Sequence, residues 1–239
     1  MTVKQRLGKV VFRHLPCTRF LFDQLRVELN GKWSKFENSV YPWRRRRLTK
    51  LRCQSGHLVN VACGPQVLAD FVNVDLFCAD KAVVKWDCRS SLPFSNCSVA
   101  GIRVEHFVEH LEVREELTSF LSNCHRVLQS GGVLRVIVPD AEKYLRAYCQ
   151  DDLSGFLALG VSVPFPAELP TRIDVVNHVF HQWQEHRWGY DFESLSLRLR
   201  QAGFSVTRRA EFGKSSMAAL AQDRKVHEPY SLYVEAIKQ

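Results

Sequence analysis

The sequence lacks long apolar runs, paired cysteine motifs and low-complexity tracts, and each absence excludes a class of protein. No stretch approaches the roughly 18 consecutive apolar residues of a membrane-spanning helix, which excludes that type of membrane protein. The basic N-terminus leads into an apolar run of only Val10, Val11 and Phe12, too short for a signal peptide. The eight cysteines form no CxxC pair, so the spacing typical of a structural zinc site is missing. We therefore expect a cytoplasmic protein with reduced, packed cysteines.

The positive charge of the chain is concentrated near its N-terminus. With 239 residues, 46% hydrophobic and 24% charged, the sequence is typical of a folded protein with one large domain and an attachment, or with two small domains. Residues 1–52 hold 14 basic and 3 acidic residues, a net charge of +11, while the whole chain carries +8. The densest part is Trp43 followed by four arginines, residues 44–47. Such a block can bind the phosphates of RNA, of a nucleotide sugar or of an anionic membrane.

Apolar residues of this arm recur at near-helical spacing, at Phe20, Leu21, Phe22, Leu25 and Leu29. The spacing predicts an amphipathic helix, which would serve as a lid on the body or lie in a membrane interface. The alternative is a solvated basic arm with a helix packed on the core. We expect residues 1–54 to form a basic helical extension. Its expected partner is an anionic membrane surface or a phosphorylated substrate, in preference to nucleic acid, and the protein would then be peripheral to the membrane.

From residue 58 onward, short β-rich runs alternate with helical stretches, a pattern typical of a parallel, doubly wound sheet. Strands are expected at 58–61, 71–76, 82–86, 99–104 and 133–138, and a closing pair at 205–212 and 231–237. Helices are expected at 113–128, 141–149 and 192–202, the last capped by Asp191 and ended by Gly203. Ser130, Gly131 and Gly132 indicate the turn that stops the first helix. Residues 150–176 indicate an irregular segment within a cap-like insertion over about 150–190.

The first two predicted strands carry the features with which α/β folds hold an adenosine. The first ends in the turn Ala62, Cys63, Gly64 and Pro65, where a glycine lets the backbone approach a ligand. The second ends near Asp75, a carboxylate suited to ribose hydroxyls. The third ends at Asp87, which suits the exocyclic amine of adenine. Both acids lie at strand C-termini, where ligands bind in α/β folds, so the set predicts a nucleoside-containing cofactor.

An ordered series of motifs resembles the class I S-adenosylmethionine (SAM)-dependent methyltransferases, in particular the small bacterial type 11 group. The resemblance covers about residues 55–239. It rests on LVNVACGP (58–65), FVNVDL (71–76), WDCRSSLPF (86–94), EHFVEHL (105–111), CHRVLQSGGVLRVIVPDAEKYL (124–145) and HRWGYD (186–191). It implies an α/β fold: a Rossmann-like three-layer sandwich with a seven-stranded, mostly parallel sheet whose last strand is antiparallel.

The resemblance also implies which residues contact SAM. The cofactor-binding set is Ala62, Cys63, Gly64, Asp75, Leu76, Asp87, Cys88, Glu105 and His106. Within it the turn would pack against methionine and ribose, and the residues after the fourth strand would line the sulfonium and the acceptor. The sequence departs from the family at Ala62, where glycine is usual, and it lacks a second glycine two residues after Gly64.

The string from His106 to His110 also matches H-x-x-E-H, the inverted zinc-protease pattern, with Glu109 as a base. A catalytic zinc would need a third ligand, which His178, His181 or His186 could supply. The resembling methyltransferases carry the same string and need no metal, so no metal is predicted.

A second cluster of chemically active residues lies just before Asp191. Neutral imidazoles are suited to removing a proton from an acceptor hydroxyl near neutral pH. The predicted catalytic bases are His106, His181 and His186, and the predicted acceptor contacts are His110, His178, Arg187 and Tyr190. The alternative places His178 and His181 as packing residues on a partly exposed helix.

The sequence thus predicts a SAM-dependent methyltransferase that acts on a small acceptor, with a hydroxyl of a saccharide or secondary metabolite favoured by analogy. One alternative is an RNA methyltransferase, supported only by the basic arm. Another is a non-catalytic adaptor with a methyltransferase fold, suggested by Ala62 and by the charge of the arm.

Overall fold

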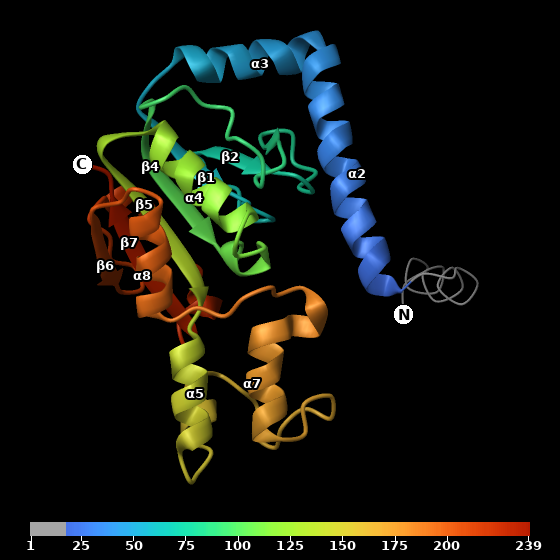
Figure 1. Cartoon of the computed structure of the whole chain (residues 1–239), viewed down its shortest axis with the longest axis vertical. Helices are drawn as coiled ribbons and strands as arrows, with labels where there is room; N and C mark the ends of the chain where they lie inside the picture. Colours follow the sequence, from blue (N-terminus) through green and yellow to red (C-terminus); the bar gives the residue numbers. More distant parts are fainter. Residues whose placement is uncertain (1–17) are drawn as a thin grey trace.

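The computed structural model describes residues 18–239 and contains one seven-stranded sheet (Figure 1). The strands are β1 (His57–Val61), β2 (Val72–Asp75), β3 (Val84–Lys85), β4 (Val99–Glu105), β5 (Leu128–Pro139), β6 (Val206–Ala210) and β7 (Ser231–Ile237). Their order is β3-β2-β1-β4-β5-β7-β6, and β7 runs antiparallel to both of its neighbours. All seven predicted strands and the antiparallel last strand are confirmed.

The helices are distributed around the sheet (Figure 1). They are α2 (Arg19–Val40), α3 (Pro42–Cys53), η1 (Val108–His110), α4 (Glu116–Val127), α5 (Ala141–Cys149), α6 (Ser154–Ala158), α7 (Arg172–His181), η2 (Gln182–Gln184), α8 (Phe192–Gln201), η3 (Ala218–Leu220) and η4 (Lys225–His227). As predicted, Asp191 caps α8 by accepting a hydrogen bond from the Ser194 amide at 2.8 Å. Gly203 follows with a positive φ of 101°. No helix of residues 18–239 is long and apolar enough to cross a bilayer.

Alternation along the central strands gives the sheet one apolar and one polar face. Ile102 and Val104 of β4, with Leu134 and Val136 of β5, are fully buried in the main hydrophobic core, which includes residues of α4 and α8. Since successive side chains of a strand point to opposite faces, Arg103 and Arg135 point the other way, and they are paired across β4 and β5. Both arginines are almost completely buried, so this second face must contain their counter-ions.

The counter-ions come largely from the C-terminal third of the chain. Arg135 donates through Nε to Asp223 Oδ1 at 2.9 Å and through Nη1 to Glu235 Oε1 at 3.2 Å. Burial alone would raise the pKa of Glu235, but hydrogen bonds from Ser215, Ser216 and Arg208 hold it at about 2. The segment between β6 and β7, which carries η3 and η4, therefore folds back over the polar face of the sheet.

Two local predictions were wrong. Helix α4 ends at Val127 and Leu128 starts β5 at once, so the glycines are not its cap. Instead Gly131, with φ 75°, lies in an irregularity of β5 and donates its amide to the Lys238 carbonyl, while the Lys238 amide donates to the Gly132 carbonyl. A side chain at Gly132 would lie 2.8 Å from the Gln129 carbonyl, which explains the second glycine.

The segment 150–176 was predicted to be irregular, but it contains α6 and the start of α7. A capping box between Thr171 and Asp174 begins α7. With α5, these helices enclose a small separate core that includes Phe156 and Val176. Helices α5 and α7 lie below the sheet in Figure 1. The predicted insertion is thus a packed helical unit.

Helix α2 packs on the body through its polar side. Gly31, Ser34 and Asn38 are its buried positions, and the last two donate hydrogen bonds to the Lys85 carbonyl. Its large apolar side chains are exposed instead, among them Leu29 (64% exposed) and Trp33 (53%). The prediction of a helical extension is confirmed for residues 18–54, but the apolar face of α2 points away from the core. Residues 1–17 of the predicted arm lie outside the described residues.

We predict that Arg135→Met destabilises the fold by about 3–5 kcal/mol, because it leaves the buried Asp223 carboxylate without its cation and removes one of the two cations beside Glu235. The matched control is Arg208→Met. Arg208 contacts the same Glu235 at 3.0 Å, but its side chain is 45% exposed, so its loss should cost less than about 1 kcal/mol. Urea unfolding of both variants checks this, and equal losses would contradict the prediction.

Candidate functional site

The turn after β1 has the backbone shape of a ligand-binding loop. Ala62 and Gly64 both adopt a φ of 50°, in the left-handed region. A side chain at Gly64 would meet no atom within 4 Å, so the space beside this turn is open. For Ala62 the same conformation is strained, since an L-residue in this region costs roughly 1–2 kcal/mol. The departure from glycine noted in the sequence therefore falls at a position that favours glycine.

Asp75, at the end of β2, holds this turn in place. Its Oδ2 accepts a hydrogen bond from the Gly64 amide at 3.0 Å. Its Oδ1 accepts from the amides of Phe77 and Cys78 at 2.6 and 2.7 Å. An ionised carboxylate has about four acceptor positions, so Oδ2 keeps capacity for one more donor. Asp75 thus joins the ends of β1 and β2 and offers an acceptor beside the open turn.

Asp87, after β3, is engaged by its own neighbour. The Arg89 guanidinium contacts both carboxylate oxygens, at 3.1 Å through Nε and 2.9 Å through Nη2. The same guanidinium donates to Glu28 of α2 at 2.6 Å. A methyl group at Gly31 would lie 2.5 Å from Asp87 Oδ2, so α2 passes directly over this carboxylate. An adenine amine can reach Asp87 only after Arg89 moves aside.

The other predicted cofactor contacts line the same strand ends. Cys63 and Cys88 are buried, and burial raises the pKa of both thiols, that of Cys63 to about 12. Both therefore stay neutral near pH 7. Leu76 lines a cavity of about 780 Å³ between the β2–β3 connection and helices α2 and α3.

Glu105, at the end of β4, is held by two buried partners. Its carboxylate contacts Arg103 and lies 3.0 Å from His227 Nδ1. Burial raises the pKa of Glu105, but these two partners outweigh it and hold the pKa at about 2. Its carboxylate is thus fixed by partners on the polar face of the sheet, and its predicted contact with the cofactor stays a prediction.

His106 is the best-oriented imidazole of the site. It follows β4 with a φ of 52°, and its amide donates to the Ile137 carbonyl. Its Nδ1 lies 3.2 Å from Glu109 Oε1, and its Nε2 lies 3.0 Å from Ser231 Oγ. The order serine, histidine, carboxylate resembles a nucleophilic triad, but Ser231 is only 2% exposed, so its hydroxyl orients the ring.

Glu109, His110 and His186 meet beside this histidine. One donor atom of each lies within 4.8 Å of the other two. Glu109 is 1% exposed, and burial would raise its pKa, but the neighbouring imidazoles, His106 first, lower it. Burial lowers the pKa of His186. The H-x-x-E-H string forms a turn and a 3₁₀-helix here, so His106 and His110 do not share the face of an α-helix.

The remaining predicted residues lie apart from this centre. His181 is exposed at the end of α7, and His178 packs its ring 5.4 Å from that of Trp183. The Arg187 guanidinium lies 5.1 Å above the Phe20 ring of α2. Tyr190 is fully buried in the main core, so the predicted contact with an acceptor does not fit its position.

Comparison with known proteins gives no match to a family model and no similar curated protein. Among solved structures, the chain is similar to a SAM-dependent methyltransferase from Archaeoglobus fulgidus, with 19% identity, 86% of this chain and 99% of that chain covered, and a TM-score of 0.45. It is also similar to a SAM-dependent methyltransferase from Thermotoga maritima, a possible histamine N-methyltransferase, with 16% identity, coverages of 92% and 97%, and a TM-score of 0.48. At identities this low, the reaction that this chain catalyses must be argued from the residues of its own site.

Sequence reasoning missed three residues that shape the site: Arg89, Ser231 and His227. Arg89 lies two residues after Asp87, a spacing at which a guanidinium can fold back on a carboxylate. Nothing in the sequence pointed to Ser231 or His227, because they reach His106 only through the fold, the latter with ring centroids 4.1 Å apart.

Ala62→Gly should relieve the strain at the turn and leave the protein as stable as the parent or more stable, by up to about 1 kcal/mol. The control is Ala158→Gly in α6, where φ is helical and the change should cost about 0.5–1 kcal/mol. Thermal unfolding measures both. A loss at Ala62 as large as at Ala158 would contradict strain at the turn.

Proposed function

We propose that this protein is a SAM-dependent methyltransferase that acts on a small acceptor. The proposal rests on the place where β1 and β2 end, which the hydrogen bond between Asp75 and the Gly64 amide joins. There the open Gly64 turn and the Asp75 carboxylate lie at the carboxyl ends of parallel strands, next to Asp87 after β3. Ligands of α/β sheets bind at this edge, and a glycine turn followed by an acid is how such sheets hold an adenosine.

These residues fit the cofactor in type and place. Asp75 Oδ2 would accept a ribose hydroxyl, and the open space at Gly64 would admit the cofactor close to the backbone. Asp87 would receive the adenine amine once Arg89 leaves it. SAM supplies an electrophilic methyl group, so the protein contributes binding, alignment and exclusion of water. Helix α2, which covers Asp87 and reaches Arg187 through Phe20, would close over the bound cofactor.

The acceptor proposed is a hydroxyl of a saccharide or secondary metabolite. Such a hydroxyl must lose a proton during transfer, and the His106 imidazole lies at the end of β4 with its Nδ1 toward the Glu109 carboxylate. A neutral imidazole beside a carboxylate is suited to act as the base, once Nε2 exchanges the Ser231 hydroxyl for that of the acceptor. Of the three histidines named from the sequence, His106 has this support, while the exposed His181 has none.

Calorimetric titration with SAM and with its demethylated product tests the cofactor. The full chain should bind both with micromolar affinity, and Asp75→Ala should weaken binding at least tenfold. Asp70→Ala, an exposed acid of the same β1–β2 connection, is the control and should bind as the parent does. Absence of binding to the parent chain would refute the methyltransferase proposal and favour the non-catalytic adaptor.

We also propose that α2 and α3 dock on an anionic membrane surface. Leu25, Leu29, Trp33, Phe36 and Val40 are all exposed and recur every three or four residues, so they form one apolar stripe along α2. Trp43, 65% exposed, lies at the start of α3, just beyond the stripe. Bulky aromatic and aliphatic side chains beside cations are typical of helices that lie in a membrane interface.

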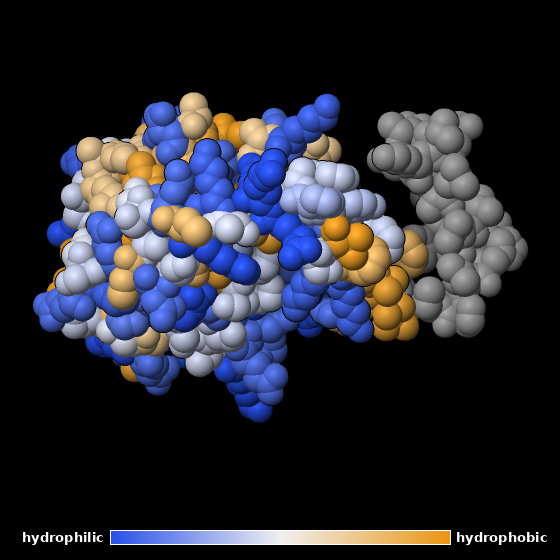
Figure 2. Space-filling view, turned by 90° about the horizontal axis from the view of Figure 1, so that it is seen from above, coloured by the Kyte–Doolittle hydropathy of each residue, from blue (hydrophilic) through white to orange (hydrophobic). Residues whose placement is uncertain are grey.

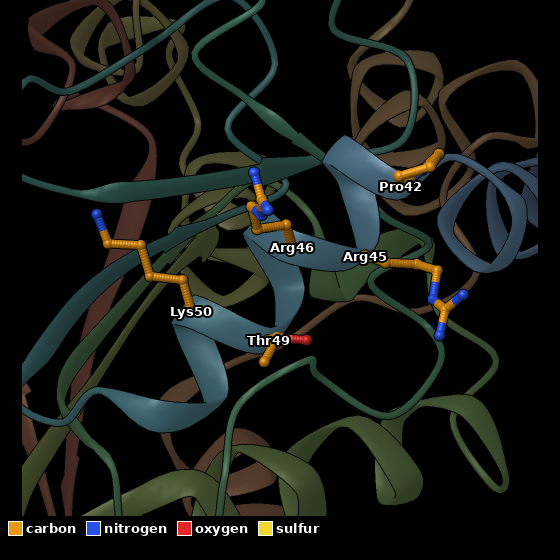
Figure 3. Close-up of a pocket in the computed structure, with 5 residues that line it drawn as sticks. All are labelled: Pro42, Arg45, Arg46, Thr49 and Lys50. Carbon is orange, nitrogen blue, oxygen red and sulfur yellow. The ribbon is translucent and has the colours of Figure 1, made fainter.

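The cations come from α3. Arg44 pairs with Glu37, and Arg47 donates to backbone carbonyls of residues 81–83, so these two hold α3 to the body. Arg45, Arg46 and Lys50 instead line a shallow hollow and project away from the helix (Figure 3). Hydrophilic side chains dominate the face seen from above in Figure 2, and apolar ones lie toward its right side and along its upper edge. The positive charge of Arg45, Arg46 and Lys50 favours phosphate headgroups as the partner of this surface over a second copy of the chain.

Sedimentation with lipid vesicles tests this docking. The chain should bind vesicles that contain phosphatidylserine, bind neutral vesicles weakly, and lose binding at high salt. Each basic residue contributes about 1 kcal/mol, so the reversal Arg45→Glu with Lys50→Glu should weaken binding at least tenfold. The matched reversal Lys214→Glu with Lys225→Glu should not. Salt-independent dimerisation through α2 in gel filtration, without vesicle binding, would reject the proposal.

A further inference from the structure

A cluster of three side chains beside the end of β4 has the construction of a metal site. Glu109 and His110 belong to η1, and His186 follows η2 some 76 residues later in the chain. The two segments are fixed to each other by backbone contacts. The amides of Arg187 and Trp188 both donate to the Glu109 carbonyl, at 2.7 and 3.3 Å. The cluster is therefore held by the fold and not by a chance approach of mobile side chains.

Both histidines present a free ring nitrogen. His110 Nδ1 lies 3.0 Å from the Glu185 carbonyl oxygen, and His186 Nδ1 lies 2.6 Å from that of Val179. A carbonyl only accepts, so each Nδ1 carries the proton and each Nε2 has its lone pair available. Histidines that bind metals commonly have their other nitrogen held by a carbonyl in this way, because it fixes the tautomer and the ring direction.

Glu109 provides an independent indication. It is 1% exposed, and within residues 18–239 neither of its carboxylate oxygens accepts a hydrogen bond. Oε1 lies 3.2 Å from His106 Nδ1, out of line for a hydrogen bond. A buried carboxylate that accepts no hydrogen bond is costly, and the His106 imidazole beside Oε1 is a counter-ion only when it is protonated. A cation between this carboxylate and the two Nε2 atoms would satisfy it.

We propose that Glu109, His110 and His186 bind one divalent transition-metal ion, of the zinc, manganese or iron(II) type. Two imidazoles and one carboxylate are a ligand set that these ions accept, and three protein ligands leave a position open to water or to an oxygen of a bound molecule. Donor atoms around a zinc ion lie roughly 3.3 Å apart, so side-chain rotations must close part of the 4.8 Å spread. His106, which the sequence motif offered as a ligand, is turned toward Ser231 instead.

If the proposed methyl transfer holds, the open position would receive the acceptor hydroxyl and lower its pKa, so that His106 removes its proton more easily. This use of the metal rests on the proposed function. The metal site itself rests only on the geometry of the cluster.

Metal titration of the chelator-treated full chain tests the site. The chain should bind one equivalent of Zn²⁺ or Mn²⁺ in calorimetry. Co²⁺ should give a visible spectrum without the sulfur-to-metal band that binding to cysteines would produce. Glu109→Gln, His110→Gln and His186→Gln should each weaken binding at least tenfold. His181→Gln is the control, because it lies on the adjoining helix, is exposed and stands outside the cluster.

Thermal unfolding with and without metal guards against variants that fail to fold. Metal should raise the unfolding temperature of the parent and of His181→Gln. It should leave the unfolding temperature of His110→Gln unchanged, and this variant should fold because His110 is only half-buried. No stoichiometric binding to the parent, a cobalt–thiolate band, or ligand variants that bind as well as the parent would overturn the proposal. Titration with SAM on the same metal-free samples separates the methyltransferase proposal from the metal proposal, since the chain can bind SAM without metal, or metal without SAM.

Discussion

The structure depends on two arginines buried in the centre of the sheet. Arg103 and Arg135 are paired neighbours on β4 and β5, and a buried cation is tolerated only with counter-charges in contact. Asp223, between the last two strands, and Glu235, on the last strand, supply them for Arg135. The C-terminal third of the chain is thereby held across a face of the sheet where the short β1–β2 and β2–β3 connections place no helix.

The same requirement shapes the surroundings of the residues that follow β4. Glu105 is bound to Arg103 and to His227, which fixes its carboxylate against the polar face of the sheet. The segment that brings His227 also brings Tyr230 and Ser231 against His106. On the opposite side of His106 lies Glu109, whose backbone carbonyl fixes the insertion through the amides of Arg187 and Trp188. One imidazole thus lies between the polar face of the sheet and the turn that holds the insertion.

The N-terminal helices impose a separate constraint. Helix α2 has its polar positions inward and its apolar positions outward, so burial of its apolar surface cannot be what holds it on the body. It is held by hydrogen bonds to the Lys85 carbonyl and by the ion pair of Glu28 with Arg89. Because Arg89 also contacts Asp87, one guanidinium links α2 to the carboxylate after β3.

The sequence by itself determined the strands, the antiparallel closing pair, the α8 cap and the places of Gly64, Asp75 and Asp87, because these follow from local periodicity, turn chemistry and the ends of strands. It could not distinguish the glycine irregularity of β5 from a helix cap, since both favour glycine at positive φ. It placed His110 and His186 among the candidates, but it could not show that Arg103 and His227 bind Glu105 or that Tyr190 is buried in the core. Only the tertiary structure decided these, because which side chain a buried arginine claims, and which residues a folded insertion brings together, depend on contacts between segments far apart in the chain.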